Sequence, residues 1–362
     1  MNLRFCLFTS ISIFTLLFTA DAATIHIPAD YSTFQAAVDA AQPDDIILVA
    51  DGIYSAPGNY DIEIDKDLII RSENGPYSCI IDPVSRGRAF ILNSLSTVHI
   101  EGFTLRNCYY AAPWGRGVGG AILGNKNLTV DSCIFSNNTV ESGSDDNAGG
   151  GAIEEADRIT NSVFYENQAI GDTYSYAGAV SGASNIENCT FYNNYADIES
   201  AISGGTVVNS IIRGGTVWGS CTYCNIEGGH EGEGNFDLDP RFANQNPFDF
   251  HLLADSPCID AGTDVYLDDD IDSDPRPLAG TFDVGADEYN GPWISPTPLP
   301  TNTPTLTPTA TQTPTPTPSS PPTVTPTPTP TPTSHLHIEL TVSHTFLQPG
   351  DDLLLESVVI NP

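Results

Sequence analysis

The sequence predicts an all-β fold in which short strands coil into a parallel β-helix solenoid, with successive turns stacked on one another. The first observation is a pair of boxes that recurs in fixed order, which indicates a stack of near-identical units and not one globular core. The second is the content of each unit, where short β-favouring pieces alternate with Gly, Asn, Asp and Ser. The copies are GGAI (119–122) with FSNN (135–138), GGAI (150–153) with FYEN (164–167), AGAV (177–180) with FYNN (191–194), and a degenerate fourth copy over 201–212.

The spacing of the copies favours strands over helices. The distance from one small-residue box to the next shrinks along the chain, and loops between short strands can lose residues at little cost. No segment of the repeat region has a sustained 3.6-residue apolar period. Pieces such as LTVDSCIF, ITNSVFY and IENCTFY therefore predict one short strand each.

Equivalent residues of stacked turns lie about 4.8 Å apart, so the repeated positions should form columns. Aromatic and small residues would stack inside the coil. Asparagines would lie at the following bend, where Asn tolerates left-handed backbone and can hydrogen-bond its stacked neighbour. We interpret these columns as structural. They are Phe135, Phe164 and Phe191; Cys133, Ser162 and Cys189; and Asn138, Asn167 and Asn194.

Residues 1–22 predict a secretory signal peptide. A charged start precedes an apolar run over 5–18 and a small-x-small cleavage site at 20–22. The apolar run is too short for a transmembrane helix, and nothing later in the sequence resembles one. We expect a secreted protein, extracellular or at the cell surface, without a transmembrane helix.

A short amphipathic helix is expected next, because Phe34, Ala37, Val38 and Ala41 line one helical face. Ser32 or Thr33 would cap it, and the helix would cover the apolar end of the stack. IILV, LIIR and FILN then start at 46, 68 and 90, an even spacing that predicts one turn of the coil per segment.

Composition excludes some partners. The chain has 46 acidic and 12 basic residues, for a net charge of −34. Nucleic acid is excluded because phosphate contacts need clustered Lys and Arg. A polyuronate is disfavoured unless cations bridge it to the protein. An acidic solvated surface is the simple interpretation, with divalent cations as natural partners.

Seven of the eight cysteines follow the predicted signal, since only Cys6 lies within it. We interpret them mainly as small buried hydrophobic residues. Cys221 and Cys224 form one CxxC that lacks a second pair of ligands, which disfavours zinc and leaves a local disulfide open after export.

Two longer segments resemble known families. IPADYSTFQAAVDAA followed by DIILVADGIY is similar to the N-terminal cap of secreted right-handed parallel β-helix proteins of the pectin-lyase-like superfamily. The GGA[IV] and FxxN boxes resemble those of polymorphic outer-membrane proteins. Residues 237–289, with DLDPRFAN, DFHLLADSPCIDAGT and GTFDVGADEY, resemble the choice-of-anchor Q module. The resemblance implies a right-handed β-helix over 23–236 and a closing module over 237–290, ahead of a surface-attachment signal.

The C-terminal part has a different composition. Residues 291–334 are dominated by Pro and Thr, which favours an extended, stiff polyproline linker. Residues 335–362 alternate in LHIELTV and LLLESVVI around a PGDD turn, which predicts the first strands of a partial, truncated β-sandwich-like domain.

Catalysis is a weaker expectation. The family resemblance implies polysaccharide cleavage, but the lyase boxes WxDH and RxPxxR are absent, as are the hydrolase boxes NTD, GHG and RxK. Glu154 and Glu155 are the weak catalytic candidates, as a carboxylate pair for a lyase or glycoside hydrolase. Adjacent residues of a strand face opposite sides, which argues against joint action. His230 and His251 are isolated in the sequence and are interpreted as structural or solvated.

Alternating aspartates in YLDDDIDSDPRP predict a structural calcium site. The pattern departs from an EF-hand loop because it lacks the central Gly and the final Glu. The alternative is a solvated acidic turn fixed by Pro275, Arg276 and Asp283, with Arg276 and Arg241 paired to nearby Asp residues. The proposed ligands are Asp268, Asp270, Asp272 and Asp274.

The expected function is binding or adhesion by a monomeric β-helix that the Pro/Thr linker holds off a surface. The ligand would be carbohydrate or another surface component, bound by aromatic residues in the loops that interrupt the repeats. Burial of the same aromatics is the alternative. An enzyme with an unrecognised carboxylate site and a purely structural stalk remain alternative functions. The ligand-binding candidates are Tyr109, Tyr110, Trp114, Tyr174 and Tyr176.

Overall fold

A computed structural model describes residues 22–291, apart from 145, 199, 246–247 and 279. These residues belong to one compact unit, Met1–Thr297. The predicted signal peptide up to residue 21, nearly all of the Pro/Thr linker and the whole segment 335–362 lie outside the described residues. No helix among the described residues is long and apolar enough to cross a membrane.

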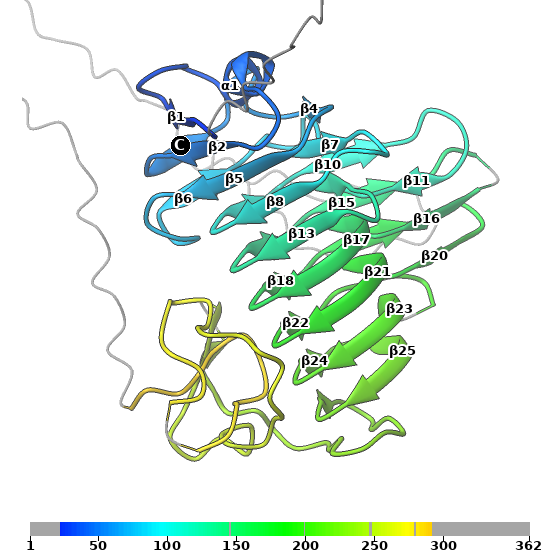
Figure 1. The fold of residues 1–362 in the computed structure, drawn as a ribbon. Coiled ribbons are helices and arrows are strands. Elements are labelled where there is room, and N and C mark those ends of the chain that lie inside the picture. Colours follow the sequence, from blue (N-terminus) through cyan, green and yellow to red (C-terminus); the bar gives the residue numbers. More distant parts are fainter. Residues whose placement is uncertain (1–21, 145, 199, 246–247, 279, 292–362) are drawn as a thin grey trace, which may run out of the picture. The chain divides into compact units, whose positions relative to one another are not determined.

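The predicted parallel β-helix is confirmed (Figure 1). One turn runs through β13 (Leu128–Asp131), β14 (Ile134–Ser136), β15 (Thr139–Glu141) and β16 (Asn147–Gly149). The next turn begins with β17 (Ile153–Thr160), which pairs in parallel with β13. All strand pairing within the coil is parallel, as expected when successive turns stack on one another.

The largest sheet has twelve strands, and the small-residue boxes of successive turns lie beside one another in it. Ile122 lies beside Ile153, Ile153 beside Val180, and Val180 beside Ile202. The degenerate fourth copy is therefore confirmed. With β13 and β17, the strands are β1 (Thr24–Ile27), β2 (Asp45–Val49), β4 (Ile62–Ile64), β5 (Leu68–Ser72), β7 (Phe90–Leu92), β8 (Val98–Glu101), β12 (Ile122–Leu123), β21 (Val180–Glu187), β23 (Ser200–Val208) and β25 (Thr216–Thr222).

One part of the predicted register is wrong. The FILN segment in β7 does not stack on LIIR in β5 but pairs with β4 and β12. The strand that stacks on β5 is β8. Each of these turns contributes two short strands to the large sheet, so even spacing along the chain does not identify the partner.

An eight-stranded sheet carries the predicted aromatic column. Phe135, Phe164 and Phe191 are fully buried, with ring centroids 4.7 and 4.8 Å apart and nearly parallel planes. Cys133, Ser162 and Cys189 are buried as expected. With β14, the strands are β3 (Gly52–Tyr54), β6 (Cys79–Ile81), β9 (Thr104–Arg106), β18 (Val163–Tyr165), β22 (Thr190–Tyr192), β24 (Ile211–Arg213) and β26 (Asn225–Ile226).

The asparagine ladder is confirmed, but one reason given for it is wrong. Asn138 Nδ2 donates to Asn167 Oδ1 at 2.9 Å, and Asn167 Nδ2 donates to Asn194 Oδ1 at 2.9 Å. The left-handed backbone belongs to the preceding residue of each turn, with φ of 53°, 55° and 51° at Asn137, Glu166 and Asn193. The ladder asparagines are therefore needed for their side-chain amides and not for a positive φ.

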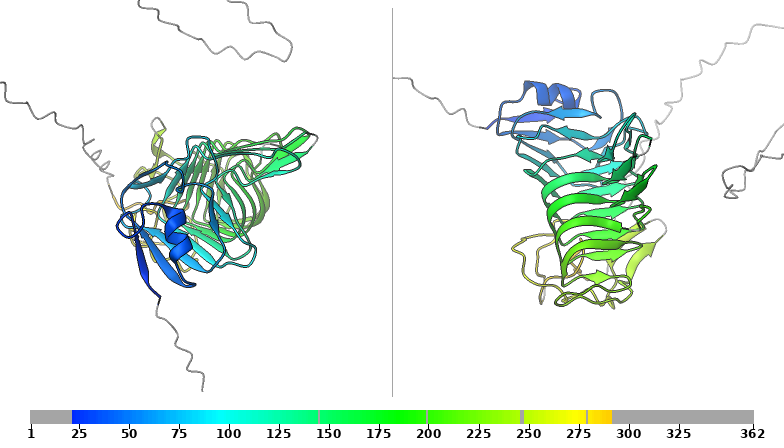
Figure 2. Two further views of the ribbon diagram at one scale, coloured as in Figure 1. Left: turned by 90° about the horizontal axis from the view of Figure 1, so that it is seen from above. Right: turned by 90° about the vertical axis from the view of Figure 1, so that its right-hand side faces the viewer.

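Helix α1 (Phe34–Ala40) covers the N-terminal end of the coil, as predicted (Figure 2). Phe34, Ala37 and Val38 are buried against the first turns. Thr33 is the N-cap, and its Oγ1 accepts from the Ala36 amide at 3.3 Å.

The segments that interrupt the repeats are partly strands, which corrects the predicted loop placement of Tyr109, Tyr110, Tyr174 and Tyr176, while Trp114 lies in a connecting loop as predicted. They form two three-stranded parallel sheets that extend from one side of the coil, and we call this part the protrusion (Figures 1 and 2). Insertions at the same point of successive turns can pair with each other in register. The first sheet is β10 (Tyr109–Ala111), β15 and β19 (Gln168–Ile170); the second is β11 (Gly117–Val118), β16 and β20 (Tyr174–Tyr176).

The region 237–290 begins with an antiparallel hairpin of β27 (Phe242–Gln245) and β28 (Phe248–Leu252). It packs along the outer face of the eight-stranded sheet, where Ile271 and Ala286 join a buried cluster with Ile134 and Val163. Hydrogen bonds add to this contact, since Ala286 N donates to Thr190 Oγ1 at 3.1 Å. We call this region the C-terminal module.

Candidate functional site

Glu154 is the candidate carboxylate with the most unusual surroundings. It lies near the start of β17, where the large sheet meets the protrusion. Arg116, from the segment before β11, and Tyr176, at the end of β20, belong to neighbouring turns and contact it or each other. The three side chains form what we call the Glu154 site.

The Glu154 carboxylate is only half satisfied. Its side chain is buried, with a residue exposure of 8%, and Oε1 accepts from Arg116 Nη2 at 2.7 Å. Oε2 is buried and makes no close hydrogen bond among the described residues, while the Ser181 side chain on the neighbouring strand lies near enough to lower the pKa of Glu154. Burial raises the pKa of Glu154, and the charges of Arg116 and Glu155 act in opposite directions on it. Because Oε2 is closed off from solvent, the part of this ion pair that a ligand can reach is the Arg116 side chain, which is 44% exposed.

Tyr176 lies beside this ion pair, and two exposed aromatic residues lie on the same protrusion. The Arg116 guanidinium lies 5.2 Å from the centroid of the Tyr176 ring. The Tyr174 and Tyr176 rings are 6.5 Å apart, and Tyr174 is 43% exposed. Trp114, in the segment between β10 and β11, is 84% exposed. An exposed indole of this size on an ordered protrusion is available for ligand contact.

Glu155 does not follow the alternation expected of a regular strand. Its φ is 63°, so the backbone turns at this residue and the simple rule of opposite faces does not apply. The charge of Glu155 also raises the pKa of Glu154, which places the two carboxylates within electrostatic reach of each other.

Tyr109 and Tyr110 lie on the other sheet of the protrusion and have partners of their own. Tyr109 donates to Glu141 Oε2 at 2.7 Å. The Arg88 guanidinium lies 3.3 Å from the centroid of the half-buried Tyr110 ring. The five predicted aromatics therefore divide into two groups, and the Glu154 site accompanies Trp114, Tyr174 and Tyr176.

The four aspartates predicted to bind calcium make separate contacts. Asp270 is buried, and it accepts from the amides of Asp272 and Asp274 at 2.8 Å through Oδ1 and from the Glu288 amide through Oδ2. Burial raises its pKa to about 6. Asp272 contacts His251, and Asp274 contacts Asn290. Calcium at these four residues stays a prediction.

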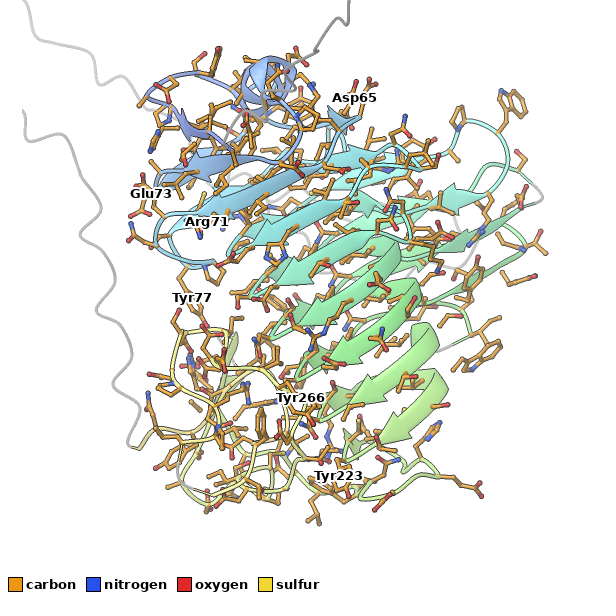
Figure 3. All side chains as sticks on the ribbon, in the orientation of Figure 1. Asp65, Arg71, Glu73, Tyr77, Tyr223 and Tyr266 are labelled. Carbon is orange, nitrogen blue, oxygen red and sulfur yellow. The ribbon has the colours of Figure 1, made fainter. Side chains whose placement is uncertain are left out.

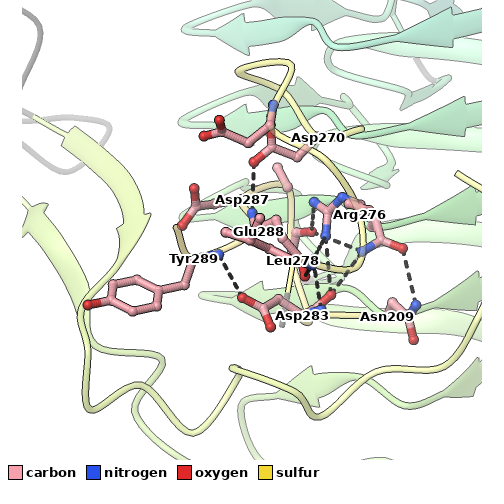
Figure 4. Close-up of polar contacts among 12 residues, drawn as sticks. Asn209, Asp270, Arg276, Leu278, Asp283, Asp287, Glu288 and Tyr289 are labelled. Atoms are coloured by element: carbon pink, nitrogen blue, oxygen red, sulfur yellow. Dashed lines mark hydrogen bonds and ion pairs between the residues drawn. The ribbon is translucent and has the colours of Figure 1, made fainter. Parts of the chain in front are cut away.

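The turn that follows is fixed by a buried ion pair (Figure 4). Arg276 Nη1 lies 2.9 Å from Glu288 Oε2, and both side chains are at most 2% exposed. The predicted pairing of Arg276 with an aspartate is therefore wrong, because its carboxylate partner is Glu288. The pairing predicted for Arg241 is confirmed, with Asp255 at 2.7 Å on the surface.

One of the two histidines, His251, has carboxylate neighbours that the sequence did not indicate. His230 is half-buried, and its Nδ1 contacts the Glu231 carbonyl. His251 is not isolated, because it contacts Asp249 and Asp272. The DFH pattern of β28 was the available signal, since residues two apart in a strand share a face.

All seven cysteines among the described residues are buried free thiols. Burial raises the pKa of Cys258 to about 11 and that of Cys133 to about 12. These thiols pack as small core residues, and the prediction of their burial is confirmed.

No protein-family model and no curated protein matches this sequence. Among solved structures, the crystal structure of pectate lyase Pel9A is similar at 15% sequence identity and a TM-score of 0.32, over 75% of this chain and 97% of that chain. The parallel pairing of the chain's own strands establishes the β-helix fold.

Proposed function

We propose that this chain is a secreted or cell-surface β-helix protein that binds carbohydrate at the Glu154 site without cleaving it. The observation that carries the proposal is the partly exposed Arg116 guanidinium, which the buried Glu154 carboxylate holds beside the Tyr176 ring. The predicted signal peptide and Pro/Thr linker support export and display, and the predicted calcium site would stabilise the C-terminal module.

Carbohydrate suits this arrangement chemically. Sugar rings present C–H faces that pack on aromatic rings, and their hydroxyl groups can accept from Arg116, whose side chain is 44% exposed. A net charge of −34 favours neutral sugars over acidic polymers.

The test is a binding screen of the full exported chain against a panel of neutral and acidic polysaccharides. Trp114→Ala and Tyr174→Ala should each weaken binding at least tenfold, because each removes an exposed aromatic face. Tyr266→Ala is the matched control, since Tyr266 is 89% exposed in the C-terminal module. Equal affinity in all three variants would contradict the proposal.

A polysaccharide-cleaving enzyme is the second candidate function, and the raised pKa of Glu154 favours it. A raised pKa is a property of carboxyls that act as general acids, and Glu155 would be the second carboxylate. Reducing-end and unsaturated-product assays should be run on the same panel. Turnover that is lost in Glu154→Gln or Glu155→Gln would replace the binding proposal with this one.

Calcium binding is tested separately by chelation. If Asp268, Asp270, Asp272 and Asp274 hold a structural calcium ion, chelator should lower Tm, and added Ca²⁺ should restore it. A Tm that chelator and Ca²⁺ both leave unchanged would remove calcium from the proposal.

A further inference from the structure

Three segments of the C-terminal module bring together side chains that can ligate a metal. His251 comes from β28, Asp272 from the acidic turn, and Asp287 from the segment after it. His251 Nε2 lies 2.7 Å from Asp272 Oδ2, and one ligand atom from each of the three residues lies within 4.8 Å of the others. Among the described residues, this is the one group of three or more His, Cys, Asp or Glu residues whose ligand atoms lie this close together.

A second contact holds each of these residues, through the side chain for His251 and Asp287 and through the backbone for Asp272. His251 Nδ1 is hydrogen-bonded to Asp249, so Nε2 faces the two aspartates. Asp287 is 7% exposed, and its Oδ2 accepts from the Leu252 amide at 2.7 Å. The Asp272 amide donates to Asp270 Oδ1. A carboxylate on the far nitrogen of a histidine is the arrangement that orients metal-binding imidazoles.

An acidic cavity of about 350 Å³ adjoins this group. Asp272 and Tyr77 line it, and the Tyr77 ring stacks on His251 with centroids 6.4 Å apart. Figure 3 shows Tyr77 where the turn after β5 approaches the C-terminal module. A cavity lined by one sign of charge concentrates counter-ions. Its other acidic residues are Glu73, Glu101, Asp131 and Asp269.

We propose that His251, Asp272 and Asp287 bind a divalent first-row transition ion, with Asp249 as the orienting residue. One imidazole and two carboxylates suit zinc, which would keep a fourth position for water. Calcium is disfavoured, because it takes oxygen ligands. In a tetrahedral zinc site, neighbouring ligand atoms are about 3.3 Å apart, so the His251–Asp272 contact needs to open only slightly. The ion would connect β28 to the acidic turn.

The test measures Zn²⁺ binding to the full exported chain after chelator treatment, by equilibrium dialysis and thermal unfolding. We expect one Zn²⁺ per chain and a higher Tm. His251→Gln and Asp287→Asn should abolish this binding, and Asp249→Asn should weaken it about 10- to 100-fold. His230→Gln is the control at a histidine outside the group, and Cys221→Ser tests the CxxC as the alternative zinc site.

Circular dichroism of each variant without metal shows whether it has folded. Co²⁺ absorption of the unmutated chain reports the coordination geometry independently of any variant, and the absence of a thiolate charge-transfer band excludes the cysteines as ligands. Absence of Zn²⁺ and Co²⁺ binding would overturn the proposal and leave His251 as an ion-paired histidine. Binding that survives in folded His251→Gln, or that is lost in Cys221→Ser, would overturn it as well. Dependence on Ca²⁺ alone would favour the four-aspartate site instead.

Discussion

At the scale of single residues, the ladder asparagines stabilise the coil by satisfying buried backbone groups. Asn167 Nδ2 donates to the Phe135 carbonyl and to Asn194 Oδ1, while its Oδ1 accepts from the Asn138 amide and side chain. All of these groups are buried, so water cannot replace a lost partner.

We predict that Asn167→Ala lowers the free energy of unfolding by about 3 kcal/mol or more, because several buried groups lose their partners together. Asn137→Gly is the matched control. It removes an exposed amide one position before the ladder and leaves a residue that accepts the φ of 53°. Chemical denaturation of both variants measures the difference, and equal losses would contradict the role given to the ladder.

The raised pKa of Glu154 predicts a pH dependence with a definite sign. A carboxyl whose pKa is higher in the folded than in the unfolded state contributes stability below its ordinary pKa and loses it as pH rises through the folded value. Glu154→Gln should therefore gain Tm relative to the unmutated chain as pH increases from 4 toward neutrality. Melting curves across this interval test it, with the exposed Glu231→Gln as control. The opposite slope would show that the Arg116 contact outweighs burial.

At the scale of elements, helix α1 depends on a cap that sequence alone left open between two residues. Thr33 has the extended backbone of an N-cap, at φ −138° and ψ 156°, and Ser32 lies exposed outside the helix. Because Phe34 contacts Tyr54, Phe90 and Phe103, the start of the helix is tied to the first turns of the coil.

Thr33→Ala should destabilise the protein by about 1 kcal/mol, since it removes the side-chain acceptor of the Ala36 amide. Ser32→Ala should have almost no effect. Denaturation midpoints of the two variants distinguish the two candidate caps. A larger loss of stability for Ser32→Ala would show that Ser32, and not Thr33, caps the helix.

The protrusion shows what could be predicted at this scale and what could not. Repeat boxes predicted the stacking of the coil, because each box keeps its place in every turn. The segments inserted between the boxes also stack from turn to turn, since Tyr109 pairs with Thr139 and Thr139 with Gln168. These positions share no residue type, so the sequence pattern did not identify them as strands.

At the scale of the whole described unit, the C-terminal module is joined to the coil by contacts between distant segments. Asn188 Nδ2 donates to the Asp283 carbonyl at 2.9 Å, and Gly285 N donates to the Asn209 carbonyl at 2.8 Å. The Arg276–Glu288 pair lies within this region, and Arg276 Nη2 also donates to the Gly285 carbonyl at 3.0 Å.

Arg276→Met should therefore destabilise the module by about 3–5 kcal/mol, because it leaves the Glu288 carboxylate buried and unpaired. Arg241→Met is the control, because the Arg241–Asp255 pair is exposed and such pairs contribute at most about 1 kcal/mol. Limited proteolysis should cleave Arg276→Met first within residues 253–291. Cleavage at the same rate in both variants would show that the buried pair does not hold the module.

The sequence by itself determined the coil, the end-capping helix and the buried columns. These features depend on local patterns: the coil and its columns on boxes that recur in every turn, and the helix on the apolar face of one short segment. Only the tertiary structure decided that β8 stacks on β5, that Arg116 holds Glu154, and that His251 lies with Asp272 and Asp287. Such contacts depend on the paths of connecting segments, which leave no regular spacing in the sequence.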